Sequence, residues 1–180
     1  TADSNEIWID VALENGGKII GRSGGLNEGR EVDPWSHFLN VYMLDKNGNR
    51  IDRRNAQDIF TPLYNNQMPP GTGQVAHYRF KVPEDTKGEI KVSVKLHYRK
   101  FDAKYMKYIY PDKPENDLPI VVMSSDQVNF PVNGKNTLNQ VSTKPEWQRW
   151  NDYGIGLLLK GNKGSEKGEL IQAEAAFKQV

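Results

Sequence analysis

Alternating apolar and polar positions run through most of the chain and predict short β-strands. The first such stretch, residues 6–13, has apolar side chains at every second position, namely Ile7, Ile9 and Val11. This period of two is typical of a strand with one buried face. The stretch 18–25 predicts a second strand after a glycine turn, and Asn47-Gly48 strongly indicates a hairpin turn.

The most regular alternation lies in the stretches 74–83 and 89–101, which a short polar loop separates. Because each stretch has one apolar and one polar face, we expect the two to pair as an antiparallel hairpin with one face in solvent. Further short strands with turns between them are typical of two stacked sheets. The sequence therefore predicts a mainly β fold, an antiparallel β-sandwich of about seven strands over residues 1–140.

Near its end the chain changes to helical spacing. Thr143 and Glu146 have the form of a capping box, and the helical pattern that follows extends to Gly161. After a polar loop a second helical pattern begins, so we expect a helix-turn-helix over residues 141–180. The second helix is still in pattern at Val180. We favour further repeats after it in the native protein; the alternative is a terminal helical hairpin that folds back on the sheet.

The composition narrows the classes of function. Apolar residues make up 37% of the 180 residues and charged residues 26%, which is typical of a folded globular chain. The formal net charge is +1, so no overall field favours nucleic acid or an anionic membrane. No apolar run approaches the roughly 18 residues of a membrane-spanning helix. We therefore expect neither nucleic-acid binding nor membrane insertion.

The chain has no cysteine, which removes disulfides, thiol nucleophiles and covalent haem attachment through C-x-x-C-H. The sequence also lacks G-x-S-x-G, H-E-x-x-H and a glycine loop for phosphate. Its three histidines lack the carboxylate spacing of a zinc site. These patterns favour a chain that is not an enzyme and has no metal site of its own.

The two helical patterns share a set of large and small positions. Trp150, Gly154 and Leu157 form a large–small–large pattern on the first, and Ala173 and Phe177 are small and aromatic on the second. In these positions the region resembles a tetratricopeptide repeat. Gly154 and Ala173 would let the helices approach closely, while Trp150 and Phe177 fill the flanks. The loop between the helices is longer than the family's usual turn, and about three such repeats are needed to cover one another's apolar faces.

Strand and turn motifs occupy residues 36–83: SHFLNVYMLD, NRIDRRN, TPLYN, PPG and VAHYRFKVP. With the helices, they make residues 30–180 resemble a β-domain of bacterial exported electron-transfer proteins, which lies between a multihaem c-type cytochrome segment and tetratricopeptide repeats. The resemblance implies a structural and interaction module, in the periplasm or outside the cell, that docks partners through its helical repeats. The family's C-x-x-C-H units are absent here, so the resemblance implies haem c on an upstream segment or a partner chain.

The resemblance also indicates two groups of candidate site residues. Neutral imidazoles can serve as axial ligands to a haem that another segment holds, and the candidates are His37, His77 and His97. The predicted hairpin would place basic residues on one outward surface for haem propionates or an acidic partner, and these are Arg79, Lys81, Lys91, Lys95 and Arg99. The alternative for both groups is an ordinary solvated strand surface.

A second class of function stays open. A stand-alone β-sandwich that binds a ligand such as carbohydrate would use aromatic side chains as a stacking platform, and Trp8 and Trp35 are the candidates. A module of that class would need no haem-bearing neighbour.

Overall fold

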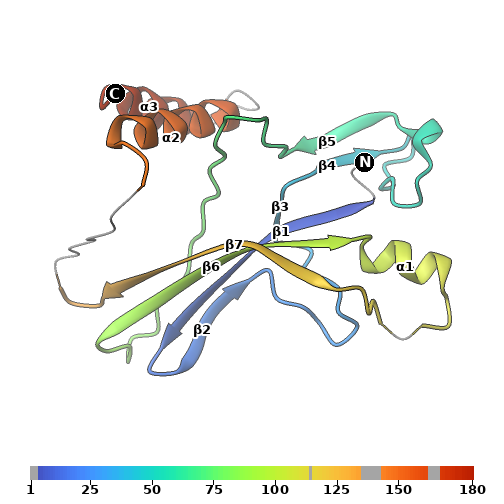
Figure 1. Ribbon diagram of the computed structural model, residues 1–180, viewed down its shortest axis with the longest axis horizontal. Helices are drawn as coiled ribbons and strands as arrows, with labels where there is room; N and C mark the ends of the chain where they lie inside the picture. Colours follow the sequence, from blue (N-terminus) through green and yellow to red (C-terminus); the bar gives the residue numbers. More distant parts are fainter. Residues whose placement is uncertain (1–3, 114, 135–142, 162–166) are drawn as a thin grey trace. The chain divides into compact units, whose positions relative to one another are not determined.

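The chain forms two compact units. The first, the β unit, comprises Thr1–Asn66 and Phe80–Thr137, and the second, the helical unit, comprises Gln67–Arg79 and Leu138–Val180. Each unit is therefore assembled from two separate parts of the sequence. The computed structural model describes residues 4–113, 115–134, 143–161 and 167–180 (Figure 1).

The main sheet of the β unit is antiparallel. Its strands are β1 (Asn5–Asn15), β2 (Lys18–Ser23), β3 (His37–Phe38), β6 (Glu89–Lys100) and β7 (Ile120–Pro131). Their order is β2-β1-β6-β7, with β3 also paired to β1. Ten consecutive residues of β1 pair with β6, so these two long strands form the centre of the sheet. The expectation of a mainly antiparallel β fold is confirmed.

A second sheet pairs β4 (Val41–Leu44) with β5 (Thr61–Asn65), and a short 3-10 helix, η1 (Ala56–Asp58), lies between them in the sequence. The predicted turn at Asn47-Gly48 is present. Gly48 has a φ angle of 82°, and the Asp45 carboxylate accepts two hydrogen bonds of 2.8 Å from backbone N–H groups of the turn. A side chain thus holds the turn that follows β4.

The predicted pairing of 74–83 with 89–101 is wrong. The second stretch forms β6, but β6 pairs with β1 and β7, and the first stretch contains no strand. Residues 67–79 belong to the helical unit instead. Alternation along the chain indicates extended backbone with two unlike faces, but it does not specify the neighbouring strand.

The main sheet has one apolar face and one face of mixed polarity. On the apolar face, β1 contributes Ile7, Ile9, Val11 and Leu13, whose partners in β6 are Tyr98, Leu96, Val94 and Val92. Phe80 covers this face at Gly21 of β2, where a Cβ atom would lie 2.6 Å from the Phe80 ring. The opposite face carries Glu6, Trp8 and Asp10 of β1, because successive residues of a strand point to opposite sides.

A short helix, α1 (Ala103–Ile109), follows β6 (Figure 1), although the sequence analysis expects no helix there. Its N-cap is Asp102, whose carboxylate accepts a hydrogen bond of 2.8 Å from the backbone N–H of Tyr105. Aspartate is among the residues most favoured at this position. Aromatic and lysine residues are interleaved in α1, and this pattern did not lead us to expect a helix that starts after Asp102.

The two predicted helices are confirmed as α2 (Glu146–Gly161) and α3 (Lys167–Phe177). At Gly154 of α2 a Cβ atom would lie 2.7 Å from the Phe177 ring of α3. At Gly156 it would lie 2.8 Å from a methyl group of Val75 and 3.1 Å from the Val75 backbone nitrogen. Residues two apart on a helix point in nearly opposite directions, so α2 lies between α3 and the extended residues 73–75.

Of the four residues expected to pack the helices, Gly154 lies against Phe177, and Ala173 is buried. Trp150 is half-buried, and its ring lies edge-on to that of Tyr153 at 6.3 Å. Residues 67–79 are a third component of this unit that the sequence pattern does not predict.

Gly156→Ala is expected to destabilise the helical unit by about 1–3 kcal/mol, because the added methyl group meets the backbone of residues 74 and 75. Gly168→Ala in α3 is the matched control. No neighbouring atom of the described residues lies within 4 Å of its Cβ position, so the helix gains up to about 1 kcal/mol. Urea unfolding followed by tryptophan fluorescence measures both changes. Equal effects of the two substitutions would contradict close packing at Gly156.

Candidate functional site

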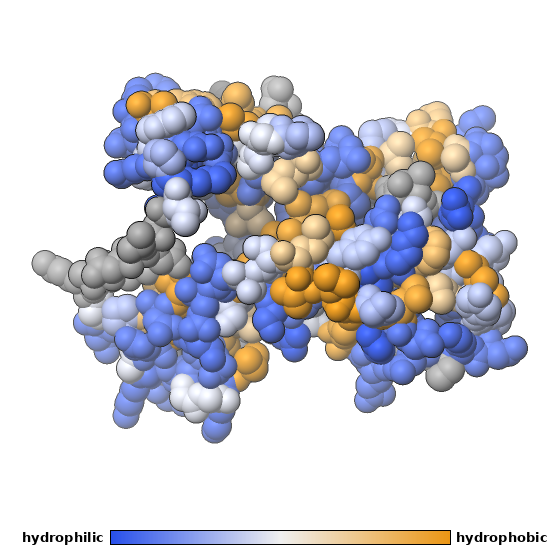
Figure 2. Space-filling model, viewed as in Figure 1, coloured by the Kyte–Doolittle hydropathy of each residue, from blue (hydrophilic) through white to orange (hydrophobic). Residues whose placement is uncertain are grey.

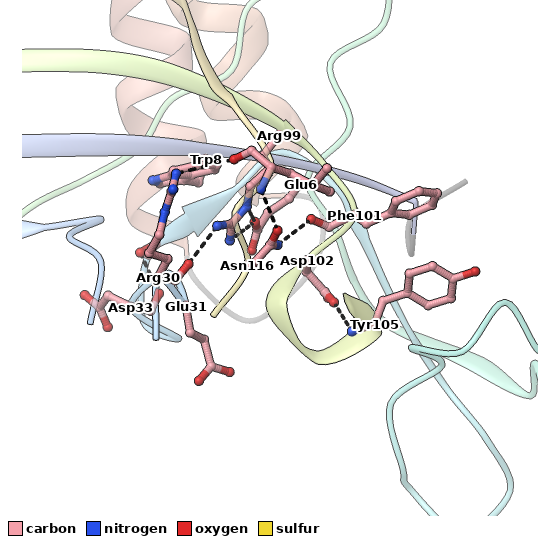
Figure 3. Close-up of polar contacts among 12 residues, drawn as sticks. Glu6, Trp8, Arg30, Glu31, Asp33, Arg99, Phe101, Asp102, Tyr105 and Asn116 are labelled. Carbon is pink, nitrogen blue, oxygen red and sulfur yellow. Dashed lines mark hydrogen bonds and ion pairs between the residues drawn. The ribbon is translucent and has the colours of Figure 1, made fainter. Parts of the chain in front are cut away.

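The mixed face of the main sheet contains a buried ion pair between β1 and β6 (Figure 3). The Arg99 guanidinium donates to Glu6 through Nε and Nη2, at 2.9 and 2.6 Å, and the Arg99 side chain is 0% exposed. Its Nη1 donates to the backbone carbonyl of Arg30 at 2.7 Å. Burial of a charge is tolerated where the charge is paired and hydrogen-bonded, as it is here.

Opposite charges face each other along β1 and β6. Three basic residues of β6 each lie across from an acidic residue of β1, and the pairs are Arg99 with Glu6, Lys95 with Asp10 and Lys91 with Glu14. The last of these pairs has an N–O distance of 2.8 Å. Because opposite charges directly across two strands attract, this ladder favours the observed register.

The structure does not bring together the five basic residues expected on one outward surface. Arg99 is buried, and Lys91 is paired with an acidic residue of β1. Arg79 belongs to the helical unit, and Lys81 lies in the β unit outside any strand. Lys95 is exposed on β6. The expected surface would form only if the two basic stretches paired with each other as a hairpin. Instead β6 pairs with β1, whose residues across from the basic ones are acidic.

Two residues with left-handed backbone adjoin the buried pair (Figure 3). Arg30 has a φ angle of 56° and Phe101 one of 60°, a region that residues other than glycine rarely adopt. The Arg30 carbonyl accepts from Arg99, and the Phe101 carbonyl accepts a hydrogen bond of 3.2 Å from the buried side chain of Asn116. Buried polar side chains therefore hold the backbone at both positions.

A second ion pair joins Arg50 and Asp102 at 3.0 Å, and the charges of both residues shift the pKa of Glu6. Burial raises the pKa of Glu6 from 4.5 to about 7, against the attraction and hydrogen bonds of Arg99. The charge of Asp102 adds to this rise, and that of Arg50 opposes it. Burial outweighs the attraction, so Glu6 takes up a proton more readily than an ordinary glutamate does.

Glu6, Arg50 and Asp102 line a cavity of about 130 Å³ in the β unit. Its apolar and aromatic lining residues include Val32, Pro34, Phe38, Tyr42 and Tyr64. Its polar lining residues include Glu6, Glu31, Asn40, Arg50, Asp102 and Lys104. We call this space the β-unit cavity. Concave sites of mixed polarity are the usual places where small molecules bind.

Two tyrosines in contact with each other are among the residues that line the β-unit cavity. The rings of Tyr42 and Tyr64 lie 5.3 Å apart, inclined by 37°, and the Arg50 guanidinium lies 5.1 Å from the centre of the Tyr42 ring. Burial raises the pKa of Tyr64, so its hydroxyl stays protonated at neutral pH. The Oδ1 atom of Asn40 is buried and has no hydrogen-bond partner among the described residues. Such an acceptor is costly unless water or a ligand binds it.

His97, a candidate haem ligand, is part of the mixed face of the main sheet. Its ring stacks on that of Trp8 at 5.1 Å, and its Nε2 atom lies 3.6 Å from the Asp10 carboxylate. Burial lowers the pKa of His97 against the attraction of Asp10, so the imidazole is neutral at neutral pH. A metal could bind Nε2 only by displacing the contact with Asp10.

The two candidate histidines of the β unit, His37 and His97, are not brought together. His37 in β3 is the cross-strand partner of Ile9, whereas His97 is the partner of Trp8. Because consecutive residues of β1 point to opposite faces, His37 and His97 lie on opposite faces of the main sheet. His77 is exposed in the helical unit and belongs to no strand. The predicted hairpin between the stretches that contain His77 and His97 does not form, since β6 pairs with β1 and β7.

The two tryptophans considered as a stacking platform differ in exposure. Trp8 is 1% exposed, and its Nε1 donates to the Gly24 carbonyl at 3.1 Å, so Trp8 belongs to the core and offers no surface for stacking. Trp35 is 90% exposed on a turn in which the Asp33 carboxylate accepts from its backbone N–H at 3.0 Å. The platform of two tryptophans is therefore wrong.

Within the described ranges, no group of three or more His, Cys, Asp or Glu side chains is placed to hold a metal ion. Among the helices that the structure describes, none combines the length and the apolar character needed to cross a bilayer. No known family model, curated protein or solved structure matches the chain. The function is therefore inferred from the residues themselves.

The polar residues of the β-unit cavity were not predicted from the sequence. One signal is available: Glu6, Asp10 and Glu14 recur at every fourth position of an alternating strand, which places them on one face and favours a basic partner strand. No local pattern connects Asn40 or Arg50 with this face, because they reach it only through the tertiary fold.

Arg99→Ala is expected to lower the free energy of unfolding by about 3–5 kcal/mol, because it removes the cation that pairs with the buried Glu6 carboxyl. Arg22→Ala is the matched control. The Arg22–Asp10 pair has a similar distance of 2.9 Å, but the Arg22 side chain is 50% exposed, so its loss costs about 0–1 kcal/mol. Urea unfolding of both variants measures the difference. A loss in Arg99→Ala no larger than that of the control would contradict the central role of the buried pair.

The raised pKa of Glu6 predicts that stability depends on pH. The unfolded chain loses this proton near pH 4.5 and the folded chain near pH 7. The contribution to stability is therefore complete below pH 4.5 and is lost, by about 3 kcal/mol, as the pH rises through 7.

Glu6→Gln removes this titration and keeps a carbonyl oxygen for Arg99. We expect the free energy of unfolding of the variant, relative to the natural chain, to increase from pH 4.5 to above pH 7. His97 titrates in both chains, so its contribution cancels in the comparison. A constant difference over this range would contradict the raised pKa.

Proposed function

We propose that this chain is a non-catalytic structural and interaction module of a bacterial exported multihaem cytochrome system. In this proposal the β unit is a sandwich-type domain that packs against haem-bearing segments, and the helix pair begins a tetratricopeptide-type array. Another segment or a partner chain carries the haem c groups, because the sequence has no cysteine to attach them. The motifs within residues 30–180 and the presence of the expected helix pair support the proposal.

The exposed apolar side chains of α2 and α3 carry this proposal. Ile171 is 67% exposed and Trp147 55%, and Leu158 and Leu159 are exposed as well. Figure 2 shows apolar residues at the surface of these helices among hydrophilic ones. Apolar surface of this kind commonly marks a site of protein interaction. In helical arrays the neighbouring hairpin covers it, so the partner we propose for α2 and α3 is another helical hairpin.

The assembly isolated from its natural source through a tag on this chain is expected to show the Soret band of c-type haem. In the same assembly, limited proteolysis should leave α2 and α3 intact, because a neighbouring hairpin covers them. Ile171→Lys places a charge in that apolar contact and should make the helices sensitive to protease.

Gln172→Lys is the matched control, since it adds the same charge at the adjacent exposed position and should leave the helices protected. A colourless preparation would contradict the link to haem. Equal cleavage of the natural chain and both variants would contradict the helical partner.

A further inference from the structure

The dipeptide Asn-Gly occurs three times in the chain, at residues 15–16, 47–48 and 133–134. In this dipeptide the glycine nitrogen lies next to the asparagine side chain, and the absence of a glycine side chain lets the two groups approach closely. Asparagine loses its side-chain amide more readily before glycine than before bulkier residues. Because all three copies contain the same reacting pair, the structure decides how far each of them can react.

The reaction is deamidation, and it requires only water. The backbone nitrogen of the glycine attacks Cγ of the asparagine, so that an N–Cγ bond forms and the Cγ–Nδ2 bond breaks. The amide leaves as ammonia, which takes its third hydrogen from the glycine N–H group. Water then opens the cyclic imide at either carbonyl group. Opening at Cγ gives aspartate, and opening at the main-chain carbonyl gives isoaspartate, whose main chain passes through Cγ.

The first copy lies at the end of β1 and is held by its side chain. Nδ2 of Asn15 donates to the backbone carbonyl of Lys87 at 2.7 Å and to that of Glu89 at 2.8 Å. The side chain would have to rotate and lose both hydrogen bonds before Cγ could meet the nitrogen of Gly16. Asn15 is therefore protected in the folded chain.

The second copy lies in the turn after β4 and is held by its backbone. The N–H of Asn47 donates to the Asp45 carboxylate at 2.8 Å, and the N–H of Gly48 donates to the Asp45 carbonyl at 3.1 Å. The same carboxylate also accepts from Asn49. The nitrogen that must attack is thus engaged, and the turn has to open before Asn47 can react.

The third copy follows β7, and both of its residues are exposed. Val132 donates to the Gly88 carbonyl at 2.9 Å, and pairing with the neighbouring segment ends there. Among the described residues no partner holds the side-chain amide of Asn133, and Gly134 has no set of hydrogen bonds like that around Asp45. The dipeptide at 133–134 therefore needs the least opening of the structure to reach the reactive geometry.

We propose that Asn133-Gly134 is a site of spontaneous deamidation, at which the chain acquires isoaspartate or aspartate directly after β7. Either product adds a negative charge, and isoaspartate also adds a carbon atom to the main chain. The change lies between β7 and the place after Thr137 where the chain passes to the helical unit. The proposal goes beyond the haem-related function and does not depend on it, since no partner takes part in the reaction.

The test is an incubation of the folded 180-residue chain for several weeks at mildly alkaline pH and physiological temperature. The chain is then digested at mildly acidic pH, where the reaction is slow, and the peptides are quantified by mass spectrometry and reversed-phase chromatography. Asn133 is expected to lose its amide at least about tenfold faster than Asn15, because opening two hydrogen bonds has to precede the reaction at Asn15. Asn47 should also react more slowly than Asn133.

The same incubation in concentrated urea is the control. Unfolding removes the hydrogen bonds that distinguish the three copies, so their rates should become similar. Asp45→Ala is the matched variant, because it removes the carboxylate that holds the turn at Asn47 and leaves the end of β7 unchanged. It should speed the reaction at Asn47 in the folded chain and leave the rate at Asn133 as it is.

Two results would overturn the proposal. One is an Asn133 that keeps its amide in the folded chain while it loses the amide in urea, which would show that the end of β7 is protected. The other is a rate at Asn15 or Asn47 in the folded natural chain that equals the rate at Asn133, which would show that the dipeptide alone decides the reaction.

Discussion

The pairing of β1 with β6 is the interaction on which the β unit depends. Glu6 and Arg99 are 93 residues apart in the sequence, yet they form a buried ion pair near one end of this contact. A shift of the register by one residue would move Arg99 to the opposite face and leave the Glu6 carboxyl buried without its cation. The ladder of acidic and basic residues along the same strands penalises other registers as well.

The same arginine connects the sheet to the β-unit cavity. Arg99 holds the carbonyl of Arg30, and the residues directly after Arg30 form part of the cavity wall. Two residues after the end of β6, Asp102 begins α1 and pairs with Arg50, which forms another part of that wall. The shape of the β-unit cavity thus follows from the way the end of β6 is held.

Elements with their own period and their own turn or cap residues could be predicted from the sequence. The strands over 6–13 and 89–101 and both helices of the helical unit are of this kind. The partner of each strand could not be predicted in this way, because residues 74–83 alternate as regularly as β6 and yet belong largely to the other unit. The polar residues of the β-unit cavity could not be predicted either. Asn40 and Arg50 lie in segments whose local pattern indicates only a strand and a turn. Tertiary contacts bring them to the same cavity, and the local sequence does not show these contacts.

The helical unit is not simply a C-terminal addition to the β unit. The chain passes between the units three times, after Asn66, Arg79 and Thr137. The segment between the first two crossings lies against α2 at Gly156, while α3 lies against α2 at Gly154. Two glycines in one helix therefore allow close contact with two parts of the chain that are far apart in sequence, at a cost in helix propensity of about 1 kcal/mol each. Because strands of the β unit flank this segment on both sides, the helices are tied to the β unit by more than one connection.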